Sequence, residues 1–190
     1  MTSEGEQGTA LAPQIIVVMG VSGAGKTTVG QLLAEDLGWP FYEGDDYHPQ
    51  ANVEKMSQGI PLTDEDRAVW LDRLRALIDG LLAAGGSAVV ACSALKRSYR
   101  QHLGRDRPAV RFVYLKGSQQ LIRRRMEERQ DHFMEEDLLA DQFETLEEPS
   151  DMLTVSVDKE PDDIVAEIRA RLDLKAGALG QQASDSEERL

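Results

Sequence analysis

Cysteine is almost absent from this chain, since Cys92 is the only one among 190 residues. A single cysteine cannot form a disulfide within the chain, and proteins without a disulfide framework are typical of reducing compartments. Residues 1–13 lack the basic and apolar segments of a secretory signal. The sequence also has no run of about 18 apolar residues, the length needed to span a membrane. We therefore expect a cytoplasmic protein.

Basic residues are in the minority, with 21 Lys and Arg against 34 Asp and Glu and a net charge of -13. A chain this acidic repels polyanions, so nucleic acids and anionic membranes are disfavoured as partners. The 41% content of hydrophobic residues is ordinary for a globular protein. We expect one domain over residues 15–175. The segments 1–14 and 176–190 lack hydrophobic periodicity and are expected to be disordered tails.

Short β-branched runs alternate with helical patterns along the domain, which is typical of a parallel sheet covered by helices on both faces. Strands are expected at 15–19, 39–43, 87–92, 110–115 and 153–157. Helices are expected at 26–37, 49–57, 64–84, 96–103, 119–128, 135–146 and 161–172. Thr63 and Asp66 resemble a capping box at the start of the longest helix. Its apolar stripe should face the core and comprises Val69, Trp70, Leu74, Leu77, Ile78, Leu81 and Leu82.

A glycine-rich segment after the first strand matches the phosphate-loop pattern Gly-x4-Gly-Lys-Ser/Thr at every fixed position. It comprises Gly20, Val21, Ser22, Gly23, Ala24, Gly25, Lys26 and Thr27, with Thr28 directly after it. Glycine lets the backbone turn so tightly that its N–H groups converge on phosphate oxygens, and a helix N-terminus adds partial positive charge. The pattern predicts ATP binding, with Lys26 on the β- and γ-phosphates and the Thr27 hydroxyl on Mg²⁺.

A phosphate loop indicates a nucleotide but not a reaction. The sequence has no Asn-Lys-x-Asp signature for guanine, which disfavours a GTPase. Neither the 87–92 strand nor the 110–115 strand ends in the acidic residue expected of a hydrolytic ATPase. These absences leave a small kinase as the favoured class.

Several blocks beyond the loop resemble the gluconokinase family. They include Asp45-Asp46-Tyr47-His48-Pro49, Pro61-Leu62-Thr63-Asp64-Glu65-Asp66-Arg67, Ser93-Ala94-Leu95-Lys96 and Gln142-Phe143-Glu144-Thr145-Leu146. The resemblance implies phosphoryl transfer from ATP to the 6-hydroxyl of D-gluconate, which yields 6-phosphogluconate and ADP. It also implies an α/β three-layer sandwich of the nucleoside-monophosphate-kinase type, with a five-stranded parallel sheet. A mobile helical lid at about 125–137 and a homodimer complete this expectation.

Phosphoryl transfer depends on positioning and on neutralising charge. Asp45 follows the second strand and is the expected acid-base group for the sugar hydroxyl. Lys26, Arg125 and Arg129 are the other expected catalytic residues. Arg125 and Arg129 are spaced i, i+4 on one helix face, so that closure of the lid would bring two guanidinium groups over the transferred phosphoryl group.

Gluconate is an anionic polyol, so its site should offer a guanidinium for the carboxylate and hydrogen-bonding groups for the hydroxyls. Arg67 is the candidate for the carboxylate, and His48, Lys96 and Gln142 are further substrate candidates beside Asp45. Simpler roles stay open for four of these residues, and the first is that Asp45 belongs to an acidic turn that caps a helix. Arg67 could pair with neighbouring acids, His48 could cap a turn, and Lys96 could be a solvated lysine at a helix start.

Three residues depart from the family pattern, since Glu43, Asp131 and Asp141 stand where Asp, Gly and a small polar residue are more usual. We expect Glu43 to shift a water or metal contact and Asp131 to lower turnover or ATP affinity, without a change of reaction. Two other functions remain open: a shikimate-kinase-like or other small-metabolite kinase, and a non-catalytic nucleotide-binding regulator. A shikimate-type site would be expected to have a glycine triplet after the third strand, where this chain has Cys92-Ser93-Ala94-Leu95-Lys96. A regulator would bind ATP without releasing ADP.

Overall fold

The computed structural model describes residues 12–128 and 136–174. The expected C-terminal tail, most of the N-terminal tail and residues 129–135 of the expected lid lie outside this range, and so do Arg129 and Asp131. Gln14 was expected to end the N-terminal tail. Its backbone N–H donates to Ser87 Oγ at 3.0 Å, and its carbonyl accepts from the Ala88 N–H at 3.0 Å. Gln14 is therefore held against the sheet.

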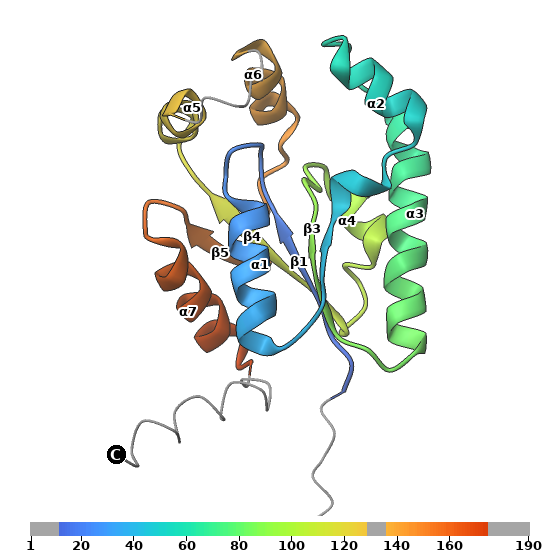
Figure 1. The fold of residues 1–190 in the computed structure, drawn as a ribbon, viewed down its shortest axis with the longest axis vertical. Coiled ribbons are helices and arrows are strands. Elements are labelled where there is room, and N and C mark those ends of the chain that lie inside the picture. Colours follow the sequence, from blue (N-terminus) through green and yellow to red (C-terminus); the bar gives the residue numbers. More distant parts are fainter. Residues whose placement is uncertain (1–11, 129–135, 175–190) are drawn as a thin grey trace, which may run out of the picture.

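A parallel sheet of five strands forms the centre of the molecule (Figure 1). The strands are β1 (Ile15–Met19), β2 (Phe41–Glu43), β3 (Ala88–Ala91), β4 (Val110–Lys116) and β5 (Leu153–Ser156). They lie in the order β2-β3-β1-β4-β5, and each neighbouring pair is parallel. In the register, Val17 lies opposite Val90 of β3 and Phe112 of β4. The expected fold class is confirmed.

Helices cover both faces of the sheet, with α1 and α7 on one face and α3 and α4 on the other (Figure 1). The helices are α1 (Lys26–Leu37), α2 (Gln50–Ser57), α3 (Asp64–Ala83), α4 (Arg97–Leu103), α5 (Gln119–Glu128), α6 (Glu136–Thr145) and α7 (Pro161–Leu172). A short 3-10 helix, η1 (Gly44–Tyr47), was not predicted. Within residues 12–128 and 136–174, no helix combines the length and apolar character that crossing a membrane requires.

The central strand β1 shows why its sequence is apolar without alternation. Ile16 and Val18 belong to the core on the α1 and α7 face, whereas Ile15, Val17 and Met19 belong to the core on the α3 and α4 face. All five side chains are fully buried. A strand covered on both sides has no solvent face, so no polar residue interrupts it.

The longest helix, α3, begins as the sequence predicts. Thr63 Oγ1 accepts from the Asp66 N–H at 3.2 Å, and Asp66 Oδ2 accepts from the Thr63 N–H at 2.9 Å, which completes the capping box. Trp70, Leu74 and Ile78 are buried in the core, as expected. Val69 was wrongly assigned to the core stripe, because it is 49% exposed. Consecutive helical residues point about 100° apart, so Val69 turns outward when Trp70 faces the sheet.

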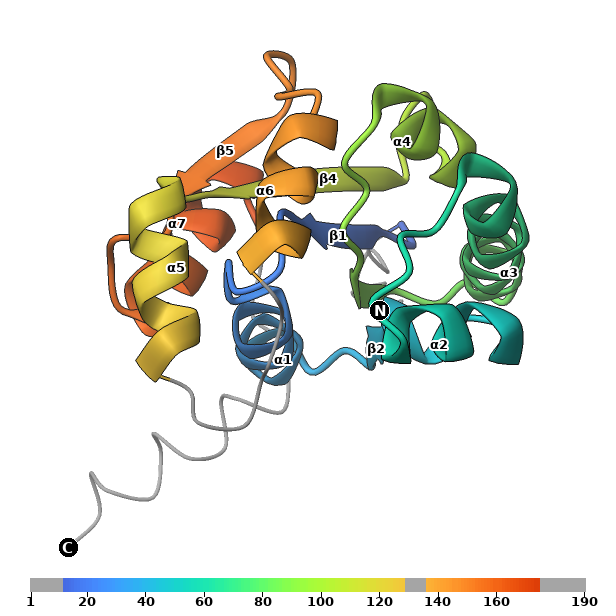
Figure 2. The same cartoon turned by 90° about the horizontal axis from the view of Figure 1, so that it is seen from above.

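The carboxyl ends of the strands meet at one edge of the sheet. Seen from above, α5 and α6 lie over one side of this edge and α2 lies on the other (Figure 2). The connections that leave β1, β2 and β3 carry the phosphate loop, Asp45 and Lys96. Topology therefore brings residues far apart in the sequence to one place, where ligands bind in open α/β sheets.

Candidate active site

The phosphate loop connects β1 to α1 and depends on its glycines. Gly20, Gly23 and Gly25 have φ values of 149°, 78° and 91°, a region that residues with a Cβ rarely adopt. Gly25 is the N-cap of α1, and among the described residues no side chain caps that helix. The first turn of α1 also contains no acidic residue. Its N–H groups and its partial positive charge are therefore available to a phosphate.

Lys26 begins α1, and its ammonium group folds back towards the loop. Lys26 Nζ donates to the Val21 carbonyl at 3.2 Å. Burial lowers the pKa of Lys26, while the negative charges of Asp45 and Glu43 oppose this shift. The ammonium is thus a weakly solvated charge at the mouth of the loop, where phosphate oxygens can compete for it.

The Thr27 hydroxyl, next to Lys26 in the chain, contacts the Glu43 carboxylate. Thr27 Oγ1 donates to Glu43 Oε2 at 2.6 Å, although the two residues come from α1 and β2. A hydroxyl and a carboxylate are the hard donors that Mg²⁺ prefers, and Mg²⁺ usually takes its remaining ligands from water and phosphate. The donor set fits that metal. Across the described part of the chain, His, Cys, Asp and Glu do not gather in a group of three or more that could hold an ion by themselves.

Asp45 and His48 lie just after β2. Asp45 is part of η1, and His48 is the C-cap of η1. The Asp45 carboxylate is 68% exposed, whereas the His48 side chain is 6% exposed. His48 Nε2 lies 3.9 Å from Asp45 Oδ1. Gly44, just before them, has no space for a Cβ, which would collide with the Ala91 carbonyl oxygen. A glycine at this point allows η1 to lie directly against β3.

Asp64 gathers the two basic residues expected at the substrate site. Lys96 Nζ donates to both Asp64 oxygens at 2.8 and 2.7 Å, and Arg67 NH1 lies 3.9 Å from Asp64 Oδ1. Tyr99 also donates to Asp64, at 2.5 Å. These hydrogen bonds, first that of Lys96 and then that of Tyr99, lower the pKa of Asp64. Arg67 NH1 additionally donates to the Leu62 carbonyl at 2.5 Å.

Gln142 of α6 lies on the phosphate loop. Its Oε1 accepts from the Ser22 N–H at 2.7 Å, and its Nε2 donates to Ser22 Oγ at 3.0 Å. Helix α5 also touches the loop, since a Cβ on Gly23 would lie only 2.8 Å from Met126 Cγ. Arg125, next to Met126, is half-buried. The two helices that flank residues 129–135 are therefore both anchored at the loop.

Sequence reasoning missed three contacts that shape the site. Asn52 contacts His48, Trp70 stacks on the His48 ring, and Glu43 accepts from Thr27. The i, i+4 spacing of His48 and Asn52 was a usable signal for the first contact. The other two contacts join separate elements and have no local signature. Cys92, the single cysteine of the chain, is 1% exposed, and burial raises its pKa to about 12.

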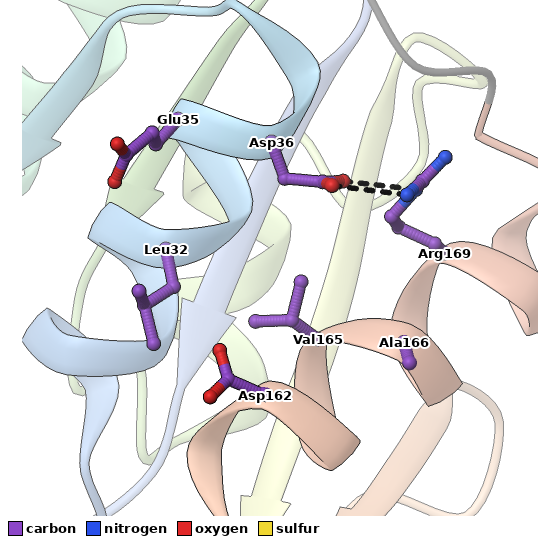
Figure 3. A pocket seen from close by; sticks show the side chains of 7 residues that line it. All are labelled: Leu32, Glu35, Asp36, Asp162, Val165, Ala166 and Arg169. Atoms are coloured by element: carbon purple, nitrogen blue, oxygen red, sulfur yellow. Dashed lines mark hydrogen bonds and ion pairs between the residues drawn. The ribbon is translucent and has the colours of Figure 1, made fainter. Parts of the chain in front are cut away.

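A hollow of about 430 Å³ between α1 and α7 lies elsewhere on the surface (Figure 3). Glu35, Asp36 and Asp162 are among its lining residues, and its one basic residue, Arg169, pairs with Asp36 at 2.9 Å. Three carboxylates against one paired cation repel anionic substrates. The phosphate loop and its surroundings are therefore the candidate active site.

Comparison with known families shows which proteins the chain is similar to. The sequence profile described as "Shikimate kinase" matches residues 22–173. Among curated proteins, a gluconokinase of Gluconobacter oxydans (strain 621H) is 48% identical over 169 residues, which cover 87% of this chain and 95% of that protein. The thermosensitive gluconokinase of Escherichia coli (strain K12) is 45% identical over 139 residues, with 73% and 74% covered.

Among solved structures, too, the chain is similar to kinases of these two families. The crystal structure of a gluconokinase from Sinorhizobium meliloti 1021 has a TM-score of 0.77 and 46% identity, and the match covers 91% of this chain and 99% of that one. A shikimate kinase from Aquifex aeolicus has a TM-score of 0.53 but only 19% identity over 84% of this chain and 96% of that chain. At that identity the likeness concerns the fold alone.

Proposed function

Because the chain belongs to the gluconokinase family of phosphate-loop kinases, we propose that it transfers the γ-phosphoryl group of ATP to the 6-hydroxyl of D-gluconate. The products are 6-phospho-D-gluconate and ADP. The observation that carries this proposal is the convergence of three features at one edge of the sheet. They are the phosphate loop with no side-chain cap on the N-terminus of α1, the exposed carboxylate of Asp45, and the two basic residues Arg67 and Lys96 beside Asp64.

Asp45 is the proposed acid-base group. It accepts the proton of the 6-hydroxyl as the hydroxyl oxygen attacks the γ-phosphorus and the bond to the leaving ADP oxygen breaks. Lys26 neutralises charge on the β- and γ-phosphates, and the N–H groups of Gly23 and of residues 25–28 hold the phosphates in place. The N–H groups of Ser22 and Ala24 already donate to Gln142 Oε1 and the Val21 carbonyl. The exposure of Asp45 and its electrostatic contact with Lys26 suit a carboxylate that faces the transferred group.

Mg²⁺ is the proposed metal ion, with Thr27 as the residue that holds it and Glu43 as the neighbouring acceptor of its hydroxyl proton. Bound with ATP, Mg²⁺ supplies charge neutralisation at the β- and γ-phosphates. Thr27 opens α1 directly after Lys26, so one helix end orients both groups. Glu43 stands where the family more often has Asp, and its longer side chain reaches the Thr27 hydroxyl.

Arg67 is the proposed partner of the gluconate carboxylate, and Lys96 and His48 bind hydroxyls or the carboxylate from neighbouring elements. Asp64 supports this assignment because it holds Lys96 and lies close to Arg67. A guanidinium matches a carboxylate in a bidentate manner, which favours a sugar acid over a neutral sugar. Gln142 binds Ser22, so its proposed role in substrate binding is indirect, through the loop.

Arg125 and Arg129 are the proposed lid residues that complete charge neutralisation over the phosphoryl group. Helices α5 and α6 both contact the phosphate loop, and this supports the proposal that the lid responds when a nucleotide binds there. The family resemblance further suggests a homodimer and a cytoplasmic location. Light scattering of the purified chain tests the former, and microscopy of a tagged chain tests the latter.

The decisive experiment measures ADP release from Mg-ATP by the full chain with a panel of acceptors. The panel holds D-gluconate, related sugar acids, shikimate, glycerate and nucleoside monophosphates. We expect turnover with D-gluconate and a product phosphorylated at the 6-hydroxyl, identified by phosphorus NMR. A Lys26→Met variant, prepared in the same way, should be inactive and controls for contaminating kinases.

The same panel tests the alternatives. Turnover with shikimate or another acid in place of gluconate would contradict the substrate assignment while leaving the kinase class intact. ATP binding without ADP release on any acceptor would favour a regulator. The shikimate alternative is the less supported one, because the close relatives are gluconokinases and the glycine triplet expected after β3 is missing.

A further inference from the structure

His48 lies beside Asp45 and is held by side chains from three elements. Its ring stacks on Trp70 of α3, with ring centroids 4.4 Å apart and planes 11° apart. His48 Nδ1 lies 3.3 Å from Asn52 Nδ2 of α2, and Nε2 lies 3.9 Å from Asp45 Oδ1 of η1. Trp70 is itself fixed, because its indole N–H donates to the Gly44 carbonyl at 2.7 Å. These contacts set the orientation of the imidazole.

Asn52 determines which imidazole nitrogen carries the proton. Asn52 is 2% exposed, and its Nδ2 donates to the Asp66 carbonyl at 2.9 Å. A carbonyl oxygen only accepts hydrogen bonds, so the atom that faces it is the amide nitrogen and not the amide oxygen. That nitrogen has a second hydrogen and does not accept. Its contact with His48 therefore requires His48 Nδ1 to be the acceptor.

An accepting Nδ1 leaves the ring proton on Nε2, the nitrogen on the side of Asp45. The 3.9 Å between Nε2 and Asp45 Oδ1 is too long for a direct hydrogen bond. A hydroxyl group that binds both residues can accept from Nε2–H and donate to the carboxylate. In that arrangement, the hydroxyl proton points at Asp45 and a lone pair remains for attack on phosphorus.

We propose that Asn52 is a positioning residue for phosphoryl transfer, which holds His48 as the neutral Nε2–H tautomer so that His48 and Asp45 together orient the attacking hydroxyl. The hydroxyl oxygen forms its bond to phosphorus, its proton passes to Asp45, and the leaving oxygen departs with ADP. His48 and Asn52 end the step unchanged. The orientation of the attacking hydroxyl rests on the proposed function, whereas the tautomer of His48 does not.

Charges around His48 agree with a neutral ring. Burial lowers the pKa of His48, the charge of Asp45 on η1 opposes this, and Arg67 on α3 lowers the pKa further. Protonation at Nδ1 would also set an N–H against the Asn52 amide hydrogen. Asn52 and Trp70, which supply the remaining contacts, are uncharged.

Asn52 also joins α2 to α3 through the Asp66 carbonyl, so a substitution that only weakens this junction must be separated from an effect on His48. Asn52→Ala and Asn52→Asp both lose the hydrogen bond to Asp66. Only the aspartate introduces an acceptor beside His48 Nδ1. The difference between these two variants therefore isolates the tautomer.

The test is nitrogen NMR of the full chain labelled with ¹⁵N-histidine, with His48 assigned by its loss in His48→Gln. At neutral pH, the parent should show a protonated Nε2 and an unprotonated Nδ1. Asn52→Ala should show a mixture of tautomers. Asn52→Asp should move the proton to Nδ1 and raise the pKa of His48 by about 1 unit or more above Asn52→Ala. Gln58→Glu makes the same charge change at the exposed end of α2 and should leave the parent tautomer.

Activity supplies the second measurement. With gluconate, the acid limb of kcat/KM should move to higher pH in Asn52→Asp by the same amount as the pKa of His48, and should not move in Gln58→Glu. A parent protonated on Nδ1, or identical His48 spectra in the two Asn52 variants, overturns the proposal. Absence of gluconate turnover in the parent overturns the proposed function, and the NMR measurement then decides the tautomer alone.

Discussion

Asp45 is an exposed carboxylate at the mouth of the phosphate loop, within reach of His48 and the field of Lys26. If it accepts the proton of the attacking hydroxyl, Asp45→Asn should lower kcat by about 100-fold or more. ATP affinity, measured by calorimetry, should stay close to that of the parent. Asp46→Asn removes the same charge from the next residue, which is also exposed, and should retain turnover. A kcat of Asp45→Asn near the parent value would exclude the acid-base role.

Arg67 is expected to bind gluconate and to take no part in the phosphoryl-transfer step. A guanidinium on the gluconate carboxylate is far from phosphorus, so the contact is similar in the ground state and the transition state. Arg67→Ala should therefore raise KM for gluconate roughly 10- to 100-fold, the equivalent of one charge-assisted hydrogen bond, with little change in kcat. Steady-state kinetics with gluconate varied checks this. The exposed Arg123→Ala serves as the control for charge, and a selective loss of kcat in Arg67→Ala would contradict the assignment.

At the scale of elements, Arg100 joins the start of α4 to the end of α6. Its NH1 donates to the carbonyls of Ala94 and Leu95 at 3.0 and 2.8 Å, and its NH2 donates to the Glu147 carbonyl at 3.0 Å. Glu147 in turn accepts from the Arg97 N–H, the first of α4, at 2.6 Å. This junction holds the turn that contains Lys96. Arg100 makes three hydrogen bonds in a fixed geometry, so another cationic side chain would not replace it.

Arg100→Met removes these hydrogen bonds while keeping an unbranched side chain. Because Arg100 is 4% exposed, the carbonyl oxygens of Ala94 and Glu147 lose this donor away from water, whereas the Leu95 carbonyl still accepts from the Glu147 N–H at 3.0 Å. We expect the free energy of unfolding to fall by about 2 to 4 kcal/mol. Urea denaturation followed by circular dichroism measures it. Arg97→Met on the exposed side of the same helix should stay within about 0.5 kcal/mol of the parent, and equal values for both variants would refute the structural role.

At the scale of the whole molecule, the excess of acidic residues makes stability depend on pH. Hydrogen bonds from Lys96, Lys55 and Lys159 lower the pKa values of Asp64, Asp66 and Glu167, respectively. In the unfolded chain, these carboxyl groups titrate near their ordinary values of about 4. Below that pH, the unfolded state binds more protons than the folded state. The stability from these groups is thus present above about pH 4 and is lost as pH falls through their folded pKa values.

We expect the urea midpoint, measured at constant ionic strength, to decline steeply below about pH 4. The comparison with Asp66→Asn is sharper because the general effect of net charge largely cancels. This variant should be less stable than the parent at neutral pH, and the difference should shrink as pH falls below about 4. A difference that is constant over this range would show that the Asp66 charge contributes nothing.

The elements and the phosphate loop follow from the sequence by itself. Apolar runs, helical periodicity, the capping box and the glycine pattern are local signals, so α1, α5 and α7 begin and end at the residues predicted. The family resemblance rested on similarly local blocks. Even η1, which was missed, overlaps the recognised Asp-Asp-Tyr-His-Pro block. Val69 shows the limit of such patterns, because an apolar residue beside the core stripe need not be buried.

Only the tertiary structure decided the strand order and the partners of the site residues. Gln142 binds Ser22 across 120 positions of sequence, and Lys96 meets Asp64 across 32. Such contacts depend on the crossover connections of the sheet and on side-chain rotamers, which a local pattern does not encode. The state of His48 depends on them most of all. The residue was identified from its block, but the carbonyl of Asp66 on another helix orients Asn52 and thereby sets the imidazole proton.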